Sequence, residues 1–147
     1  MGVEEEVKVL KRIPLFANID AAKLKLMAFA SERLSFTPGQ YLCKQGDVGD
    51  AAYIIIDGEA DVVLESEEGN LTVASVGQND IVGEIAILID VPRTASIVAT
   101  SEVVALKVTK ELFFRMVTDF PEMSVEIMRV LAHRLEAANA RLRRQAS

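Results

Sequence analysis

The segment from Val82 to Ala99 combines a glycine, a carboxylate and an arginine at a spacing that suits an anionic ligand carrying hydroxyl groups. Gly83 allows a sharp backbone turn after a strand, and 84–89 fits one or two helical turns. The free amides at the start of that short helix, those of Ile85 and Ala86, favour an anion. The segment is therefore a candidate anion site.

Two charged side chains complete this candidate site. Pro92 stiffens the return of the chain into the next strand, which we expect to begin with Arg93. An arginine fork opposite a helix N-terminus is a good binder of a phosphate diester. Glu84, on the same turn, is placed to accept hydrogen bonds from a sugar hydroxyl. The plainer alternative is a surface loop with an ordinary Glu84–Arg93 ion pair, and the chemistry alone does not choose between the two.

A β-rich body must position these residues. Between Leu34 and Val108, short strand-like runs alternate with turn signals about every eight to twelve residues, as in a sandwich or barrel. About eight strands fit this stretch, and a jelly-roll-like β-roll closes that many strands with few exposed edges. The dipeptide Asp57-Gly58 lies between two apolar runs and predicts a hairpin there.

Helices are expected on both sides of the roll. Before it, a helix-like spacing near Val7 ends at Pro14, and Asp20 is a suitable N-cap for a second helix that ends at about Ser31. After it, 110–117 reads as one helix, and Pro121 opens a longer one from the first-turn position that proline prefers.

The predicted fold class is α+β, mainly β: an eight-stranded jelly-roll-like β-roll with N-terminal helices and a C-terminal helix pair. We expect one domain over 1–147, made of a helical flap (1–33), the roll (34–108) with the anion segment (82–99), and the C-terminal helices (109–147).

Composition narrows the class of protein. The net charge of −6 argues against a protein that coats DNA or membranes. The apolar runs are too short to span a bilayer, so no membrane segment is expected. Cys43 is the only cysteine and reads as a small buried strand residue. With no signal peptide at the N-terminus, a cytoplasmic location is expected.

The last helix carries an apolar stripe at alternating spacings of three and four, which suits a short coiled-coil seam and a homodimer. Its members are Met128, Leu131, Leu135, Ala138 and Leu142. Five arginines follow from Arg129 onward. They could touch nucleic acid, but cations near a helix C-terminus also complement the helix dipole.

Taken together, Gly83-Glu84-Ile85-Ala86 and Pro92-Arg93-Thr94-Ala95-Ser96 resemble the phosphate-binding cassette of the cyclic nucleotide-binding domain family. The family includes catabolite activator-type regulators, regulatory subunits of cAMP-dependent kinase and nucleotide-gated channels. The resemblance extends from about Val7 to Arg143 through glycine-rich turns. Those turns are Pro38-Gly39, Gln45-Gly46-Asp47, Gly49-Asp50 and Gly58-Glu59, and Pro14-Leu15-Phe16 resembles the turn before the roll.

The resemblance implies a role for each matching residue. Glu84 would hold the ribose 2′-hydroxyl and Arg93 the cyclic phosphate, on a turn that Val82, Gly83 and Ile85 complete. The amides of Ala86 and Ala95 would assist at the phosphate, and the Thr94 hydroxyl would contact phosphate or base. For the base, Val73 would supply apolar packing, and Arg134 and Asn139 on the last helix are nominated for a polar contact.

The expected function is a non-catalytic sensor of cAMP, with cGMP also allowed by Thr94, that signals through its C-terminal helices to another copy or to an unidentified effector. No further cofactor, no metal and no catalytic residue is expected. Two alternatives stay open: a nucleotide-free interaction domain, and the ligand-binding subunit of a transcriptional regulator, because no DNA-binding head is expected after the last helix. A metal-dependent jelly-roll enzyme is disfavoured because His133 is the only histidine.

Overall fold

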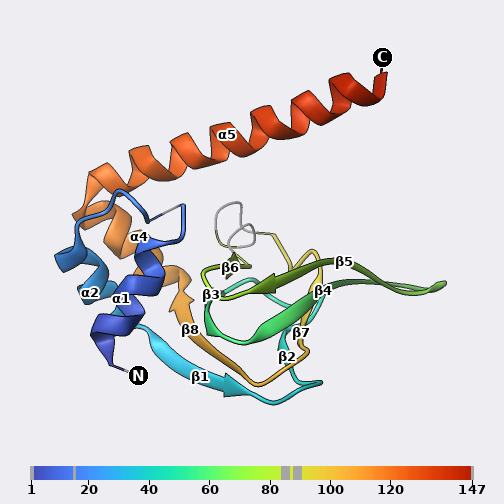
Figure 1. Ribbon diagram of the computed structural model, residues 1–147, viewed down its shortest axis with the longest axis horizontal. Coiled ribbons are helices and arrows are strands. Elements are labelled where there is room, and N and C mark those ends of the chain that lie inside the picture. Colours follow the sequence, from blue (N-terminus) through green and yellow to red (C-terminus); the bar gives the residue numbers. More distant parts are fainter. Residues whose placement is uncertain (1, 15, 84–86, 88–90, 147) are drawn as a thin grey trace.

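The computed structural model describes residues 2–14, 16–83, 87 and 91–146. Helices occur at both ends of the chain and strands lie between them (Figure 1). The helices are α1 (Val3–Lys11), α2 (Ala21–Ala30), α4 (Lys110–Asp119) and α5 (Pro121–Ala146). The strands are β1 (Glu32–Phe36), β2 (Tyr41–Cys43), β3 (Ala51–Asp57), β4 (Glu59–Ser66), β5 (Gly69–Gly77), β6 (Ile81–Val82), β7 (Ser96–Ala99) and β8 (Val103–Thr109).

The eight strands form two antiparallel four-stranded sheets, with orders β1-β8-β3-β6 and β2-β7-β4-β5. The sheets face one another as a roll, and α1, α2 and α4 lie beside the sheet that contains β3 and β8 (Figure 1). The predicted mainly-β roll with helices before and after it is therefore confirmed.

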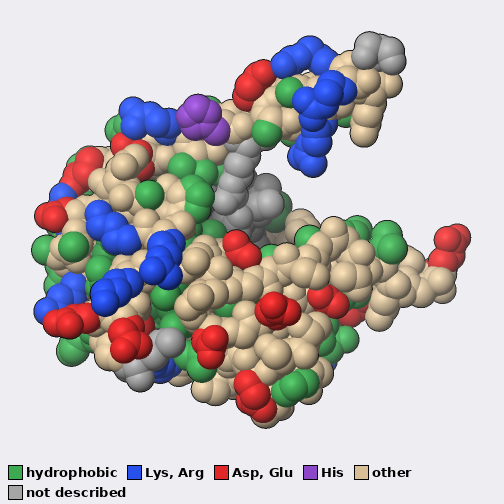
Figure 2. Space-filling view, viewed as in Figure 1, with side chains coloured by type: hydrophobic (Ala, Val, Ile, Leu, Met, Phe, Trp, Pro, Cys, Tyr) green, Lys and Arg blue, Asp and Glu red, His purple; other side chains and the backbone are tan. Residues whose placement is uncertain are grey.

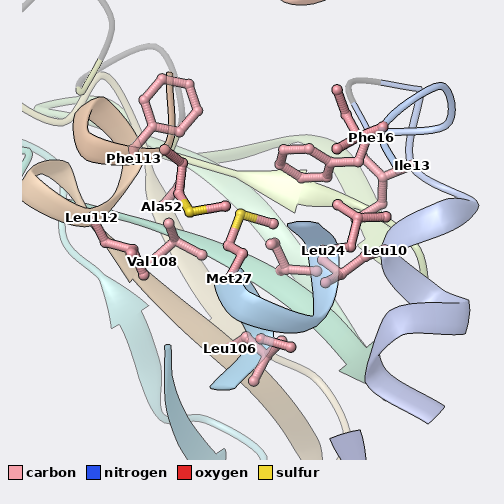
Figure 3. Packing of buried hydrophobic residues seen from close by; sticks show 14 of the residues in the cluster. Leu10, Ile13, Phe16, Leu24, Met27, Ala52, Leu106, Val108, Leu112 and Phe113 are labelled. Carbon is pink, nitrogen blue, oxygen red and sulfur yellow. The ribbon is translucent and has the colours of Figure 1, made fainter. Parts of the chain in front are cut away.

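Strand β3 belongs to two hydrophobic cores at once. Ala52, Ile54 and Ile56 point to the helices, where they join the cluster around Phe16 and Phe113 (Figure 3). Tyr53 and Ile55 point the other way, into the roll. Because both faces of the strand are covered, its sequence is a continuous apolar run instead of an alternating one.

The prediction of a hairpin at Asp57-Gly58 is wrong. Gly58 joins β3 in one sheet to β4 in the other, and its φ of +96° turns the chain between them. A side chain at Gly58 would collide with the Glu102 carbonyl, so close packing of two backbone segments, and not a hairpin turn, requires glycine here. The long hairpin of the protein is instead β4–β5, which projects from the body of the roll (Figure 1).

The helix boundaries follow the sequence closely, with one difference in capping. Leu24, Met27 and Ala28 form the buried face of α2, and Pro121 begins α5 as expected. Asp20 occupies the N-cap position of α2, but its side chain makes no capping hydrogen bond. The helix is therefore held by burial of its apolar face more than by its cap.

Candidate functional site

The turn after β6 is built around Gly83. Strand β6 pairs with β3, where Val82 lies opposite Tyr53, and Gly83 then takes a φ of +83°. A Cβ at this position would lie 3.3 Å from the Ala51 carbonyl oxygen and would overlap Nη1 of Arg93. Glycine is therefore needed for its backbone angle and for the close approach of the Arg93 guanidinium.

The Arg93 guanidinium is buried inside the roll, with the residue only 5% exposed. Nη1 donates to the Gly83 carbonyl at 3.1 Å, and Nη2 donates to the Ala51 carbonyl. The guanidinium carbon also lies 5.8 Å from the centre of the Tyr53 ring, which is within cation–π range. Two carbonyl dipoles and an aromatic face thus surround a full positive charge.

Asp50 supplies a carboxylate near Arg93, but at the limit of an ion pair. Its Oδ1 lies 4.0 Å from Nη2, and its side chain is 68% exposed. No other carboxylate of the described ranges forms an ion pair with Arg93. An exposed carboxylate at this distance neutralises a buried cation weakly.

The main chain of Arg93 is fixed by the loop that follows β2. Its N–H donates to the Asp47 carbonyl at 2.8 Å, and its own carbonyl accepts from the Gly46 N–H at 2.9 Å. The sequence prediction that a strand begins at Arg93 is wrong, because β7 begins at Ser96. The reason is that β2 ends at Cys43, so Arg93 pairs with a loop and not with a strand.

Two other groups inside the roll have raised pKa values. Burial raises the pKa of the Cys43 thiol, and the nearby Arg93 charge offsets this only in part. Burial likewise raises the pKa of the Tyr53 hydroxyl, again against the opposing effect of Arg93. Both groups are therefore neutral at neutral pH, and Cys43, which is half-buried in β2, is a poor nucleophile.

The structure brings part of the predicted site together. Val82 is buried in the roll, Gly83 contacts Arg93, and Thr94 and Ala95 follow Arg93 on the returning chain as an exposed and a half-buried residue. Glu84, Ile85 and Ala86, predicted to contact ribose and phosphate, lie outside the described residues.

The nominated base contacts belong to two other elements, β5 and α5. Val73 is exposed on β5. It lies at a bulge, as the extra residue between the Val62–Ala74 and Val63–Thr72 pairs of β4 and β5. Asn139 is exposed in the second half of α5, which extends away from the roll (Figure 1). Arg134 belongs to the same helix, but its side chain lies outside the described part of the protein.

Several contacts of Arg93 were not anticipated from the sequence. Ala51, Gly46 and Asp47 act through backbone groups, which leave no trace in residue type. Tyr53 reads in the sequence as one more member of an apolar strand, and Asp50 as part of a glycine-rich turn, so neither residue type pointed to Arg93. Among the described residues, no group of three or more His, Cys, Asp or Glu side chains could hold a metal ion. No helix within these residues is long and apolar enough to cross a membrane.

Comparison with known proteins supports the family resemblance seen in the sequence. The family model described as the cyclic nucleotide-binding domain matches residues 33–120. A cAMP-dependent protein kinase regulatory subunit of Colletotrichum orbiculare is 36% identical over 107 residues, which cover 73% of this chain and 27% of that protein. A CRP-like cAMP-activated global transcriptional regulator of Mycobacterium tuberculosis is 28% identical over 136 residues, which cover 92% of this chain and 61% of that protein.

A solved structure also resembles this chain in fold. The N-terminal domain of a transcriptional regulator from Streptomyces coelicolor A3(2) superposes with a TM-score of 0.78 at 30% identity, covering 90% of this chain and 95% of that one. The chain thus spans about a quarter to three-fifths of the curated relatives above, but nearly all of this solved domain. Because the family model covers more than half of its length, the chain belongs to the cyclic nucleotide-binding domain family.

Proposed function

We propose that this domain is a non-catalytic sensor of a cyclic nucleotide, with cAMP as the favoured ligand and cGMP as the second. The observation that carries the proposal is the buried Arg93 guanidinium, which rests on two carbonyls and a distant, exposed carboxylate. A phosphate oxygen carries negative charge and can accept the guanidinium fork in a bidentate pair, whereas the two carbonyls offer only neutral acceptors. Binding therefore moves the guanidinium from the Gly83 and Ala51 carbonyls onto the phosphate.

The remaining roles in the proposal fall to the cassette, 82–99. Glu84 holds the ribose 2′-hydroxyl, and the amides of Ala86 and Ala95 face the phosphate. Thr94 is exposed beside Arg93, where its hydroxyl contacts the phosphate or the base. That hydroxyl accommodates guanine without requiring it. The names of the kinase regulatory subunit and of the regulator given above both refer to cAMP, which favours adenine here.

The output in this proposal is a helix surface. Ile87 of the cassette is buried in the same core as Met116 of α4 and Met123 and Ile127 of α5. A cassette that moves onto the phosphate therefore shifts a side chain of the core to which both C-terminal helices contribute. The helices then present a changed surface to another copy of the chain, or to an effector in the cytoplasm.

Substitution of Arg93 tests the proposal. Arg93→Leu removes the phosphate partner and is expected to cost about 2–5 kcal/mol of binding, which is at least tens of fold in affinity. The control is Arg141→Leu, which removes an exposed arginine from α5. Calorimetric titration with cAMP and cGMP, beside thermal melts of each variant, measures both effects. Equal affinities of Arg93→Leu and the wild type would contradict the role of Arg93. Absence of binding of both nucleotides to the wild type would favour a nucleotide-free interaction domain.

A further inference from the structure

We infer that Gln45, which lies outside the cassette, is a positioning residue for Arg93. This inference rests on the proposed function, because the position of Arg93 has a consequence for binding only if Arg93 holds a ligand. Gln45 is half-buried in the loop between β2 and β3, and this loop fixes the Arg93 main chain through Gly46 and Asp47. Whatever fixes the loop therefore fixes the point from which the guanidinium extends.

The Gln45 side chain acts as a substitute for a missing strand. Strand β4 pairs with β7 only as far as the Val63–Ser96 pair, because β7 begins at Ser96. Beyond that pair, the Glu65 N–H donates to Oε1 of Gln45 at 2.9 Å, and Nε2 of Gln45 donates to the Glu65 carbonyl at 3.1 Å. One side-chain amide thus makes both hydrogen bonds that a neighbouring residue of a strand would make.

A buried serine ties this bridge to the segment that carries Arg93. The Ser96 hydroxyl, in a residue that is 0% exposed, accepts from the Gln45 N–H at 2.9 Å and donates to Oε1 of Glu65 at 2.9 Å. Ser96 follows Arg93 by three residues. The loop, the projecting β4–β5 hairpin and the Arg93 segment therefore meet at four hydrogen bonds.

Loss of the Gln45 amide is expected to loosen the loop without creating a cavity in a hydrophobic core. Gln45→Met keeps the length of the side chain and removes both amide hydrogen bonds to Glu65. We expect cAMP affinity to fall by about 5- to 30-fold, the effect of two side-chain hydrogen bonds on a site that they position. The matched control is Gln40→Met, at the other end of β2, where the glutamine Oε1 accepts from the Thr37 N–H at 2.8 Å in an exposed turn.

Two readouts separate positioning from general stability. The first is amide hydrogen exchange: in Gln45→Met the amides of Gly46 and Arg93 should exchange faster, while the amide of Ile55 in β3 should not. The second is a double-mutant cycle with Arg93→Lys. If Gln45 acts through Arg93, Gln45→Met should cost little further affinity in the Arg93→Lys background.

The outcomes distinguish this inference from the proposed function. If the wild type binds cAMP and Gln45→Met binds it equally well, the Gln45 role is wrong and the proposed function stands. The role is also wrong if the two substitutions reduce affinity additively. If the wild type binds neither nucleotide, the proposed function fails. The exchange of the Gly46 and Arg93 amides then decides alone whether Gln45 fixes the loop.

Discussion

At the scale of single residues, the site depends on a close approach between Gly83 and Arg93. The glycine lacks a Cβ where the guanidinium lies, and its carbonyl accepts one of the guanidinium bonds. The arginine thereby becomes part of the turn from which the cassette begins. A substitution at either residue therefore alters the position of the other.

Gly83→Ala tests this dependence, and Gly39→Ala is its matched control. Both glycines have positive φ, +83° and +91°, but only Gly83 has Arg93 in the space that a Cβ would occupy. Each substitution should cost about 1–2 kcal/mol of stability from the backbone angle. Only Gly83→Ala should also weaken cAMP binding, by about tenfold or more, because the guanidinium must move. Chemical denaturation measures the stability and calorimetry the cAMP affinity of each variant. Equal cAMP affinities of both variants would show that the close approach does not affect binding.

The raised pKa of Cys43 gives a pH prediction. The folded thiol holds its proton more tightly than the unfolded one, so stability is unaffected below the ordinary thiol pKa of about 8.5 and falls as pH rises above it. Tyr53 acts in the same direction above its ordinary pKa of about 10. We expect urea midpoints to fall between pH 8 and pH 10, and to fall less in Cys43→Ala. An unchanged slope in that variant would remove Cys43 as a cause.

The sequence was informative about Arg93 and uninformative about its partners. A glycine turn and an arginine nine residues after a glutamate are visible in residue types. The carbonyls of Ala51 and Gly83 are not, because every residue has one. Tyr53 reads from the sequence as one more member of an apolar strand, and only the alternation of β3 between two cores places its ring beneath a guanidinium.

At the scale of elements, the strands were more predictable than their pairing. Turn signals predicted about eight strands, and the described residues form eight, since glycine and proline end strands for local reasons. The pairing depends on contacts distant in sequence. Asp57-Gly58 therefore read as a hairpin, although β3 pairs with β8 and β6, and β4 pairs with β5 and β7.

Helix α5 carries the prediction that belongs to this scale. Its first turns pack on the body through Met123 and Ile127, whereas Met128, Leu135 and Leu142 are each about 60% exposed. The end of the helix extends from the body and carries exposed basic side chains (Figure 2). Exposed apolar side chains at this spacing suit a seam with a second α5, so the predicted homodimer remains a prediction.

A charged residue placed on the stripe tests the seam. We expect the wild type to be a dimer by light scattering, and the double variant Leu135→Glu and Leu142→Glu to be a monomer, because two carboxylates would be buried at the interface. Ala137→Glu, at an exposed position off the stripe, should leave the dimer intact. A monomeric wild type, with and without cAMP, would exclude the seam.

At the scale of the whole molecule, the two cores are joined by shared strands. Strands β3 and β8 each contribute side chains to the helical core and to the interior of the roll. A ligand held inside the roll should therefore stabilise the helices as well. At a cAMP concentration about 100 times the dissociation constant, we expect a stabilisation of about 2.7 kcal/mol and a rise in melting temperature of roughly 5–10 °C.

Helical and β-sheet signals should show the same rise. Circular dichroism in the far ultraviolet follows the helices, and the fluorescence of Tyr53 and Tyr41 follows the roll. A ligand-dependent shift in only one of the two signals would mean that the cores unfold separately, which would contradict a switch that runs from the cassette to α5.

The central claim is that Arg93 and the cassette bind the cyclic phosphate of a nucleotide, and direct titration of the wild type tests it. Isothermal calorimetry would compare cAMP and cGMP with 5′-AMP, which has the same base and ribose but an open, doubly charged phosphate. We predict saturable binding of cAMP with one site per chain, weaker binding of cGMP and far weaker binding of 5′-AMP. Absence of saturable binding to both cyclic nucleotides, in a sample that melts cooperatively, would contradict the claim.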